Sequence, residues 1–165
     1  MSLIVRPART EDLPLIEEIE AEADSLLVER FGAVDWPAPD AAVERAAEPG
    51  FLLVGEVSGR VVGFVHVLEP DSAVHLEQVA VLPRFGRRGF GRRLVDEALR
   101  VAADRGHEEI TLRTYADVPW NAPFYASCGF RVSEPSTDFQ CGLVAVEDAL
   151  GLTRYGSRVQ MTAAL

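Results

Sequence analysis

The sequence predicts an α+β fold, in which one mixed, mostly antiparallel β-sheet carries helices on its faces. Three observations lead to this prediction. Strand-like runs joined by tight turns occupy residues 51–82, which is typical of an antiparallel meander. A long amphipathic helix follows, and strands then alternate with helical segments to the end. The length of 165 residues, 48% of them apolar, suits a single domain spanning residues 1–165.

The first half of the chain holds the predicted meander. A short strand covers residues 3–5, and Thr10 is a candidate N-cap because Glu11 and Asp12 follow it in the first helical turn. Apolar residues then recur at helical spacing as far as Leu27. After this helix we expect, in order, a loop around residues 32–40, a short helix over 41–47, and strands over 51–57, 60–68 and 73–82, the first two joined by a Ser58-Gly59 turn.

The second half opens with the clearest helix, predicted over residues 89–105. Its apolar residues recur on one face, charged residues cover the other, and Gly106 ends it. The remaining elements are predicted as a strand over 109–114, a helix over 121–128 ended by Gly129, a strand over 130–132, a loop over 133–142, a helix over 143–150 and a strand over 157–164.

Composition excludes several classes of protein. The net charge of −10 opposes nucleic-acid binding, and all 16 basic residues are arginine, so no lysine nucleophile exists. Cys128 and Cys141, with three scattered histidines, form neither a disulfide framework nor a recognisable metal site. No apolar run is long enough to span a membrane, and the N-terminus lacks the pattern of a signal peptide. We expect a cytoplasmic protein without a metal ion, and the sequence is compatible with either a monomer or a homodimer.

Residues 84–92, which we call the arginine-glycine loop, are the most informative segment. A strand leads into three glycines, Gly86, Gly89 and Gly91, and a helix begins among them. Backbone N–H groups at such a turn can converge on a phosphate, and glycine allows the close approach. Five arginines and no acid lie between Arg84 and Arg93, inside an acidic chain. The loop therefore predicts a phosphate site, although its spacing is neither the dinucleotide fingerprint nor a Walker loop.

Two segments together resemble a known family. Residues 82–91 are similar to the acetyl-CoA pyrophosphate motif of the GCN5-related N-acetyltransferases (GNAT). Residues 120–130 are similar to the family's second signature, in which a tyrosine is followed after a few residues by Gly-Phe, here Tyr125 and Gly129-Phe130. The resemblance implies a three-layer α/β/α, single-domain acyl-CoA N-acyltransferase fold that uses acetyl-CoA as cosubstrate.

The resemblance also implies which residues contact acetyl-CoA. In the family, the strand matching residues 77–82 separates from the strand matching 109–114, and its main chain holds the pantetheine arm and the acetyl oxygen. The matching cofactor-binding positions are Val79, Ala80, Val81, Arg84, Gly86, Arg87, Arg88, Gly89, Phe90, Gly91, Arg92 and Asn121.

Two positions depart from the family pattern. The family often has glutamine or arginine where Gly86 stands, so Arg87 or Arg88 can replace that contact. The usual asparagine lies seven residues before the tyrosine, whereas Asn121 lies four before Tyr125. Two interpretations of Asn121 therefore stay open, a cap for the short helix or a contact to the cofactor.

Acyl transfer to an amine needs a general base and a general acid. Alternation along the predicted strand puts His75, Glu77 and Val79 on one face, and the family places a base or a water-ordering residue on this strand. Glu77 is the first candidate, His75 the second, and bulk water the third. Tyr125 matches the family's general acid, which would protonate the departing thiolate. Cys128 suggests a covalent route, but a small buried residue is the preferred interpretation.

The sequence therefore predicts an acetyl-CoA-dependent N-acetyltransferase that transfers an acetyl group directly to a primary amine of a small molecule or peptide. One alternative is a non-catalytic acyl-CoA-binding or sensing domain on the same fold, which would make Glu77 and Tyr125 dispensable. A second is a nucleotide-binding protein that uses the arginine-glycine loop for another phosphate ligand. Acidic residues on the first helix suit an amine acceptor, but they are also typical of a solvated helix face.

Overall fold

A computed structural model of the protein describes residues 2–165. Seven strands form one sheet in the order β1-β2-β3-β4-β5-β7-β6, and every neighbouring pair is antiparallel except β4 and β5, which are parallel. The strands are β1 (Ile4–Pro7), β2 (Gly50–Val57), β3 (Arg60–Leu68), β4 (His75–Val81), β5 (Glu109–Tyr115), β6 (Arg131–Ser133) and β7 (Arg158–Ala164). The helices are α1 (Leu13–Phe31), α2 (Ala42–Ala47), α3 (Phe90–Asp104), α4 (Ala122–Ser127) and α5 (Asp138–Leu150).

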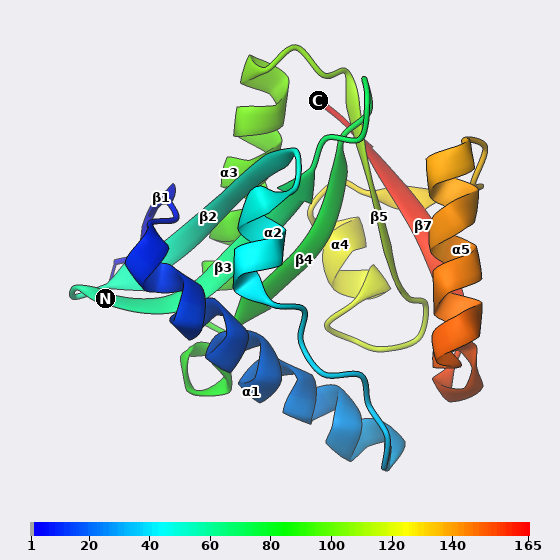
Figure 1. The fold of residues 1–165 in the computed structure, drawn as a ribbon, viewed down its shortest axis with the longest axis horizontal. Helices are drawn as coiled ribbons and strands as arrows, with labels where there is room; N and C mark the ends of the chain where they lie inside the picture. Colours follow the sequence, from blue (N-terminus) through cyan, green and yellow to red (C-terminus); the bar gives the residue numbers. More distant parts are fainter. Residues whose placement is uncertain (1) are drawn as a thin grey trace.

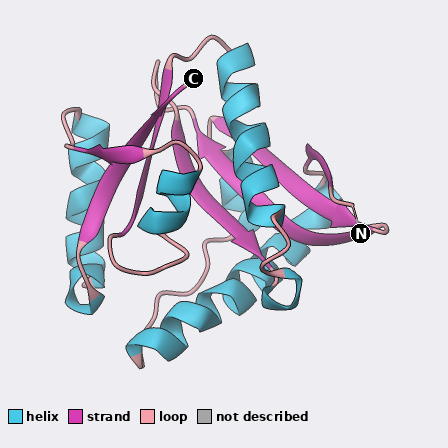
Figure 2. Cartoon of the chain, turned by 180° about the vertical axis from the view of Figure 1, so that it is seen from behind, coloured by secondary structure: helices cyan, strands magenta, loops and turns pink. Residues whose placement is uncertain are grey.

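The helices cover both faces of the sheet. Figure 1 shows α1, α2 and α5 in front of the strands, and Figure 2, seen from behind, shows α3 and α4 on the opposite face. This arrangement confirms the predicted three-layer α+β fold with a mixed, mostly antiparallel sheet. No helix among residues 2–165 is long and apolar enough to cross a membrane.

The core lies mainly between α3 and the centre of the sheet. Leu94, Val95 and Ala98 on α3 are fully buried, as are Val65 and Val67 on β3. The amphipathic pattern predicted this buried helix face, and α3 begins and ends within one residue of the predicted bounds. Because α3 is fixed against β2 to β5, its N-terminus is held next to the end of β4.

The predicted start of the first helix was wrong. Thr10 is not an N-cap but the first residue of a 3-10 turn, and α1 begins at Leu13. The buried carboxylate of Asp12 accepts hydrogen bonds from the backbone N–H of Arg9 (2.7 Å) and from the guanidinium of Arg6 (2.7 and 3.1 Å). An acid predicted to interact only with the helix dipole therefore also anchors β1 to the start of α1.

The predicted loop over residues 133–142 was also partly wrong, because α5 begins at Asp138. The side chain of Thr137 accepts the N–H of Gln140 (3.1 Å), and the Gln140 side chain accepts the N–H of Thr137 (3.3 Å). This reciprocal capping box starts the helix five residues earlier than apolar periodicity suggests. The earlier start brings Phe139 into edge-on contact with His75 of β4, at 5.4 Å between ring centroids.

Candidate active site

A cleft opens where β4 and β5 separate. The two strands pair in parallel only at His75 and Thr111 and diverge beyond that point. The cleft between them has a volume of about 1070 Å³, at the upper end of the range for ligand sites. Its walls come from β4, β5, α1, α4, α5, the loop around Trp36 and the N-terminal end of α3. Segments far apart in the sequence therefore meet at one hollow in the middle of the sheet.

A bulge in β4 sets the direction of Glu77. Gln78 lies opposite His66 of β3 and Leu76 lies opposite Val67, so Glu77 between them has no partner residue. An extra residue of this kind interrupts the alternation of side chains. Val81 packs on the α3 side, because a Cβ added at the facing Gly63 would lie 3.2 Å from Val81 and 3.0 Å from Leu94.

The prediction that His75, Glu77 and Val79 share one face was therefore wrong for Val79. Val79 is two residues from Val81 and shares its α3 side, whereas Glu77 faces α1 and α2. Val79 and Val81, which the family resemblance assigned to the pantetheine arm and the acetyl oxygen, line the cleft together with Ala80. Because of the bulge, the side chain of Glu77 faces α1 and α2, whereas the side chains of Val79 and Val81 face α3. The segment from Val79 to Val81 lies along the split between β4 and β5.

Glu77 lies in an unusual electrostatic environment. Its side chain is 30% exposed, and its Oε1 atom lies 4.0 Å from Nη1 of Arg45 on α2. Burial raises the pKa of Glu77 to about 7, while the positive charge of Arg45 limits the rise. A carboxylate with this pKa takes up and releases protons near neutral pH.

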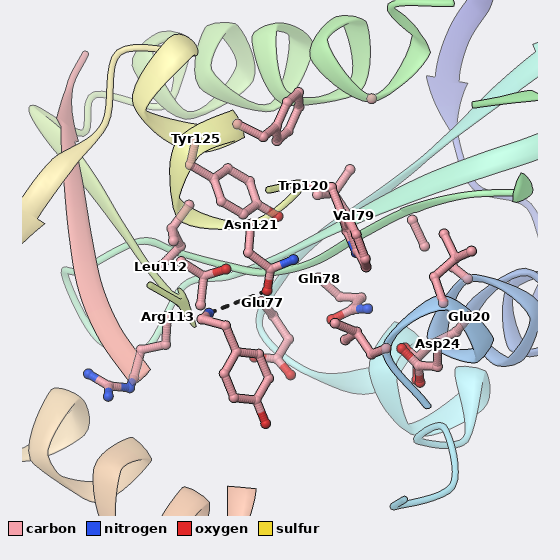
Figure 3. A pocket seen from close by; sticks show the side chains of 18 of the residues that line it. Glu20, Asp24, Glu77, Gln78, Val79, Leu112, Arg113, Trp120, Asn121 and Tyr125 are labelled. Carbon is pink, nitrogen blue, oxygen red and sulfur yellow. Dashed lines mark hydrogen bonds between the residues drawn. The ribbon is translucent and has the colours of Figure 1, made fainter. Parts of the chain in front are cut away.

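Further acids gather around Arg45, on the α1 side of Glu77. Arg45 is buried, pairs with Glu20, and lies 3.6 Å from Asp40. Burial raises the pKa of Glu20 to about 7 and that of Asp24 to about 6. Figure 3 shows Glu20 and Asp24 to one side of Glu77. This end of the cleft is therefore acidic.

His75 lies at the closed end of the split. It is 2% exposed, and its Nδ1 atom lies 2.8 Å from Oγ1 of Thr111, the residue it pairs with on β5. Burial lowers the pKa of His75 to about 4, so the ring is neutral at physiological pH. These contacts join β4 to β5 just before the strands separate.

Tyr125 projects from α4 into the same cleft (Figure 3). Its ring packs edge-on against Phe124 and Phe130, with centroids 5.2 and 5.9 Å away. No residue between 2 and 165 hydrogen-bonds to its hydroxyl, and burial raises the pKa of that hydroxyl above its ordinary value. The group therefore stays protonated at neutral pH. Cys128, one turn further on, packs against the core and does not line the cleft.

Asn121 joins α4 to the end of β5. Its Oδ1 atom accepts the backbone N–H of Tyr115 at 3.3 Å (Figure 3), and its side chain does not cap α4. Asn121 does occupy the N-cap position of α4, where its backbone carbonyl accepts the N–H of Tyr125 (3.0 Å), so the capping interpretation holds for the main chain and not for the side chain. Asn121 lines the cleft beside Tyr125, so the second interpretation, a contact to the cofactor, stays a prediction.

The arginine-glycine loop forms the other wall. Gly89 precedes α3 with φ of 78°, a left-handed conformation that favours glycine. The N–H of Arg93 bonds to the carbonyl of Gly89 (3.1 Å), so the N–H groups of Phe90 and Gly91, earlier in the first turn, have no such partner. A Cβ at Gly91 would come within 3.6 Å of Phe124. These features form a narrow site suited to an anion.

The arginines of this loop point in different directions. Arg87 and Arg92 line the cleft, together with Gly86, Gly89, Phe90 and Gly91. Arg92 also donates to the carbonyl and hydroxyl of Ser127, which fixes it against α4. Arg84 pairs with Glu22 of α1 at 3.2 Å, and Arg88 stacks on Phe85. Neither Arg84 nor Arg88 is part of the cleft lining.

Three charged residues of the cleft were not predicted from the sequence. Glu147 of α5 accepts hydrogen bonds from Arg113 of β5 (2.7 and 3.1 Å) and from Arg158 of β7 (3.0 Å), and all three residues line the cleft. The hydrogen-bonding arginines hold the pKa of Glu147 below its usual range, although burial opposes this. Each residue alone resembles an ordinary surface charge, so only the folded chain reveals the cluster. Among residues 2–165, no group of histidine, cysteine, aspartate or glutamate is arranged to hold a metal.

A model of the acetyltransferase (GNAT) family matches residues 15–130. That span is more than half of the chain and contains β4, the arginine-glycine loop and Tyr125. The chain belongs to the GNAT family. The family resemblance inferred from the two sequence signatures is thus confirmed.

Solved GNAT structures share the whole architecture. PaiA N-acetyltransferase from Thermoplasma acidophilum, in complex with coenzyme A, has a TM-score of 0.74 at 17% identity, with 100% of both chains covered. Ribosomal-protein-S18-alanine N-acetyltransferase from Escherichia coli has a TM-score of 0.71 at 20% identity, covering 99% of this chain and 94% of that one. N-acetylglutamate synthase from Neisseria gonorrhoeae, complexed with coenzyme A and N-acetyl-glutamate, has a TM-score of 0.70 at 16% identity and is covered over 35% of its length. Identities this low establish the fold and leave the acceptor open.

Proposed function

We propose that the protein is an acetyl-CoA-dependent N-acetyltransferase that transfers an acetyl group directly to a primary amine of a small molecule or peptide. The observation that carries the proposal is the split between β4 and β5. Glu77, Tyr125 and the N-terminal end of α3 all border the one cleft that this split opens. A base, an acid and an anion site are the groups that this transfer requires.

The residues at the cleft fit acetyl-CoA. Backbone N–H groups at Phe90 and Gly91, with the guanidinium groups of Arg87 and Arg92, would hold the pyrophosphate. Main-chain groups of Val79 and Val81 along the split would hold the pantetheine arm and polarise the acetyl oxygen. When bound, acetyl-CoA supplies an activated thioester, in which the C–S bond breaks as the C–N bond to the acceptor forms.

Glu77 is the proposed general base. The acceptor arrives as an ammonium ion and must lose a proton before its nitrogen is nucleophilic. The carboxylate of Glu77 can take that proton near neutral pH, because its pKa is about 7 and no hydrogen bond to a described residue occupies it. His75 is less suited, since it is bound to Thr111 and its pKa of about 4 makes it a weak base.

Tyr125 is the proposed general acid, which donates its hydroxyl proton to the departing sulfur. Its raised pKa keeps the proton in place before the reaction. The thiolate forms in the same apolar surroundings, and burial raises the proton affinity of a thiolate as it does that of a phenolate. Burial therefore acts in the same direction on both groups, so the raised pKa of the hydroxyl is accompanied by a raised proton affinity of the thiolate.

Two measurements test the proposal. A thermal-shift comparison of acetyl-CoA, coenzyme A, ATP and NAD should show stabilisation by the first two compounds alone. Thiol release should then be followed with amino acids, polyamines, aminoglycosides and peptide N-termini as acceptors, and at least one class should be turned over. Acetyl-CoA binding without turnover of any amine would favour the sensing domain, and stabilisation by ATP or NAD would favour the nucleotide-binding alternative.

A further inference from the structure

The Arg113, Glu147 and Arg158 cluster carries more positive charge than its carboxylate neutralises. Two guanidinium groups share the one carboxylate of Glu147. The side chains are largely buried, with exposed fractions of 8% for Arg113, 15% for Arg158 and 9% for Glu147. Burying an uncompensated positive charge is costly, so a cluster with a net charge of +1 is suited to a further anion.

The arginines also keep hydrogen-bond donors available. Arg113 uses Nε and one terminal nitrogen on Glu147, and Arg158 uses one terminal nitrogen. The Nη1 atom of each arginine bonds to no described residue, and neither is among the fully buried atoms of the described chain. The guanidinium carbon of Arg158 lies over the ring of Tyr115, 4.5 Å from its centroid. These donors are therefore not fully buried, and both arginines line the cleft.

The cluster lies on the face of the sheet from which Glu77 is reached. Arg113 precedes Thr114 and Tyr115 on β5, across the split from Glu77 on β4, and Figure 3 shows Arg113 and the acids Glu20 and Asp24 on opposite sides of Glu77. Burial raises the pKa of both Glu77 and Tyr125 and the charge of Arg158 opposes that rise, so the arginine is within electrostatic reach of both groups. The cleft is thus acidic toward α1 and basic toward α5.

We propose that the acceptor is a small molecule of the amino-acid type, and that Arg158 together with Arg113 binds its carboxylate while its amine lies at Glu77. This proposal rests on the proposed function, because it concerns the acceptor half of the same cleft. An ammonium group fits the acidic side and a carboxylate fits the arginine pair. Binding both ends would fix the amine beside the base, which is how positioning groups accelerate a transfer.

The test compares acceptors that differ only in the carboxylate. Thiol release is measured with proteinogenic amino acids, with the corresponding amino acid amides, and with peptides that present only a free N-terminus. For the best amino acid, we expect kcat/KM to exceed that of its amide by about 10- to 100-fold, the range for one charge-assisted contact. Equal or faster turnover of amides or peptides would overturn this proposal and leave the N-acetyltransferase intact. No turnover of any amine would instead overturn the proposed function itself.

Variants then assign the preference to the arginine pair. Arg158→Gln should reduce the ratio of amino acid to amide kcat/KM to near one, while acetyl-CoA affinity measured by calorimetry stays close to that of the wild type. The ratio is the decisive quantity, because differences in amine pKa between the two acceptors cancel when variant and wild type are compared. A purely structural role would lower both rates together, and an unchanged ratio would overturn the assignment.

Two further variants make the result independent of folding. Arg131→Gln removes an exposed arginine of β6 outside the cleft and should leave the ratio unchanged. Arg158→Lys keeps the charge that balances Glu147 but loses the planar fork, so it should fold and still lower the ratio. If Arg158→Gln does not fold, an unchanged ratio in Arg158→Lys overturns the assignment in its place.

Discussion

The Oε1 atom of Glu77 lies 4.0 Å from Nη1 of Arg45, too far for a hydrogen bond but close enough for a strong electrostatic effect. The guanidinium of Arg45 forms an ion pair with Glu20, and its Nη1 atom lies 2.9 Å from Nδ1 of His66. The guanidinium therefore stabilises the charged form of Glu77 without occupying its oxygens. Burial acts in the opposite direction, and the balance gives a carboxylate whose pKa is about 7 and which is free to accept a proton.

The first prediction concerns this carboxylate. Glu77→Gln keeps the size of the side chain and removes its basicity, so kcat/KM should fall by about 10²-fold or more. In the wild type, kcat/KM should rise with pH through about 7, because the base acts only when deprotonated. This rise, the acidic limb of the pH profile, should be absent from the profile of Glu77→Gln.

The matched control for Glu77 is His75 on the same strand. His75→Asn should change kcat/KM far less and should keep the acidic limb, because the neutral ring serves to join β4 to Thr111. Loss of the limb in His75→Asn, with Glu77→Gln close to the wild type, would transfer the role of base to His75. Loss in neither variant would mean that water takes the proton.

The second prediction concerns the left-handed glycine at the start of α3. Gly89→Ala should weaken acetyl-CoA binding, because a side chain at φ of 78° strains the turn that presents the backbone N–H groups. Gly59, in the turn between β2 and β3, has the same φ of 78° and equally open surroundings, but it does not line the cleft. Gly59→Ala should cost similar stability, on the order of 1–2 kcal/mol, and leave acetyl-CoA affinity unchanged.

Calorimetry with acetyl-CoA and thermal unfolding of both glycine variants separate the two effects. Arg87→Ala and Arg92→Ala should each weaken binding by about 1.5–3 kcal/mol if their guanidinium groups contact phosphate. Arg84→Ala should have little effect, since Arg84 pairs with Glu22 outside the cleft lining. Equal affinities in all three arginine variants would remove the side chains from the phosphate site and leave the backbone alone.

Most of the fold could be predicted from the sequence because its signals are local. The apolar stripe of α3 and the turn at Ser58-Gly59 are carried by neighbouring residues, and these elements lie close to the predicted bounds. The start of α5 was missed because its signal is a pair of polar side chains, Thr137 and Gln140, and not an apolar period. Asp12 lies in the 3-10 turn before α1 and not in the first turn of the helix, because its bond to Arg6 on β1 depends on packing between distant segments.

The site was less predictable, because its geometry depends on pairing between distant strands. The bulge at Glu77 arises from the register between β3 and β4, which no single segment encodes, so the faces of Glu77 and Val79 could not be deduced from alternation. Arg113, Glu147 and Arg158 come from three separate elements and carry no shared sequence motif. Glycines, by contrast, mark local backbone demands, and the predicted turn at Gly89 is the left-handed start of α3.

The third prediction concerns stability at low pH. His66 and His75 are buried, and burial lowers the pKa of each to about 4, below the value of about 6.5 for an unfolded chain. At these two positions the unfolded state binds more protons, so the stability that the neutral histidines contribute is present in full above about pH 6.5 and is lost between about pH 6.5 and 4. The raised pKa values of Glu20, Glu77 and Asp24 act in the opposite direction over the same range, so the effect of His75 is taken from the difference between variant and wild type. Denaturant unfolding across this range measures the effect. The free energy of unfolding of His75→Asn, relative to that of the wild type, should therefore rise as the pH falls from about 6.5 to 4.

The last prediction separates an enzyme from a sensor at Tyr125. Tyr125→Phe removes the one hydroxyl and keeps the ring, so the edge-on packing with Phe124 and Phe130 and the fold itself should survive. The hydroxyl bonds to no described residue, so its removal leaves no buried partner unsatisfied. An intact thioester carries no charge on sulfur, and acetyl-CoA should therefore bind with near wild-type affinity. Charge develops only as the thiolate departs, so kcat and kcat/KM should fall together, by about 10²-fold or more. Calorimetry and thiol release on the same preparation test both halves, and turnover equal to the wild type with a good acceptor would remove Tyr125 from the mechanism.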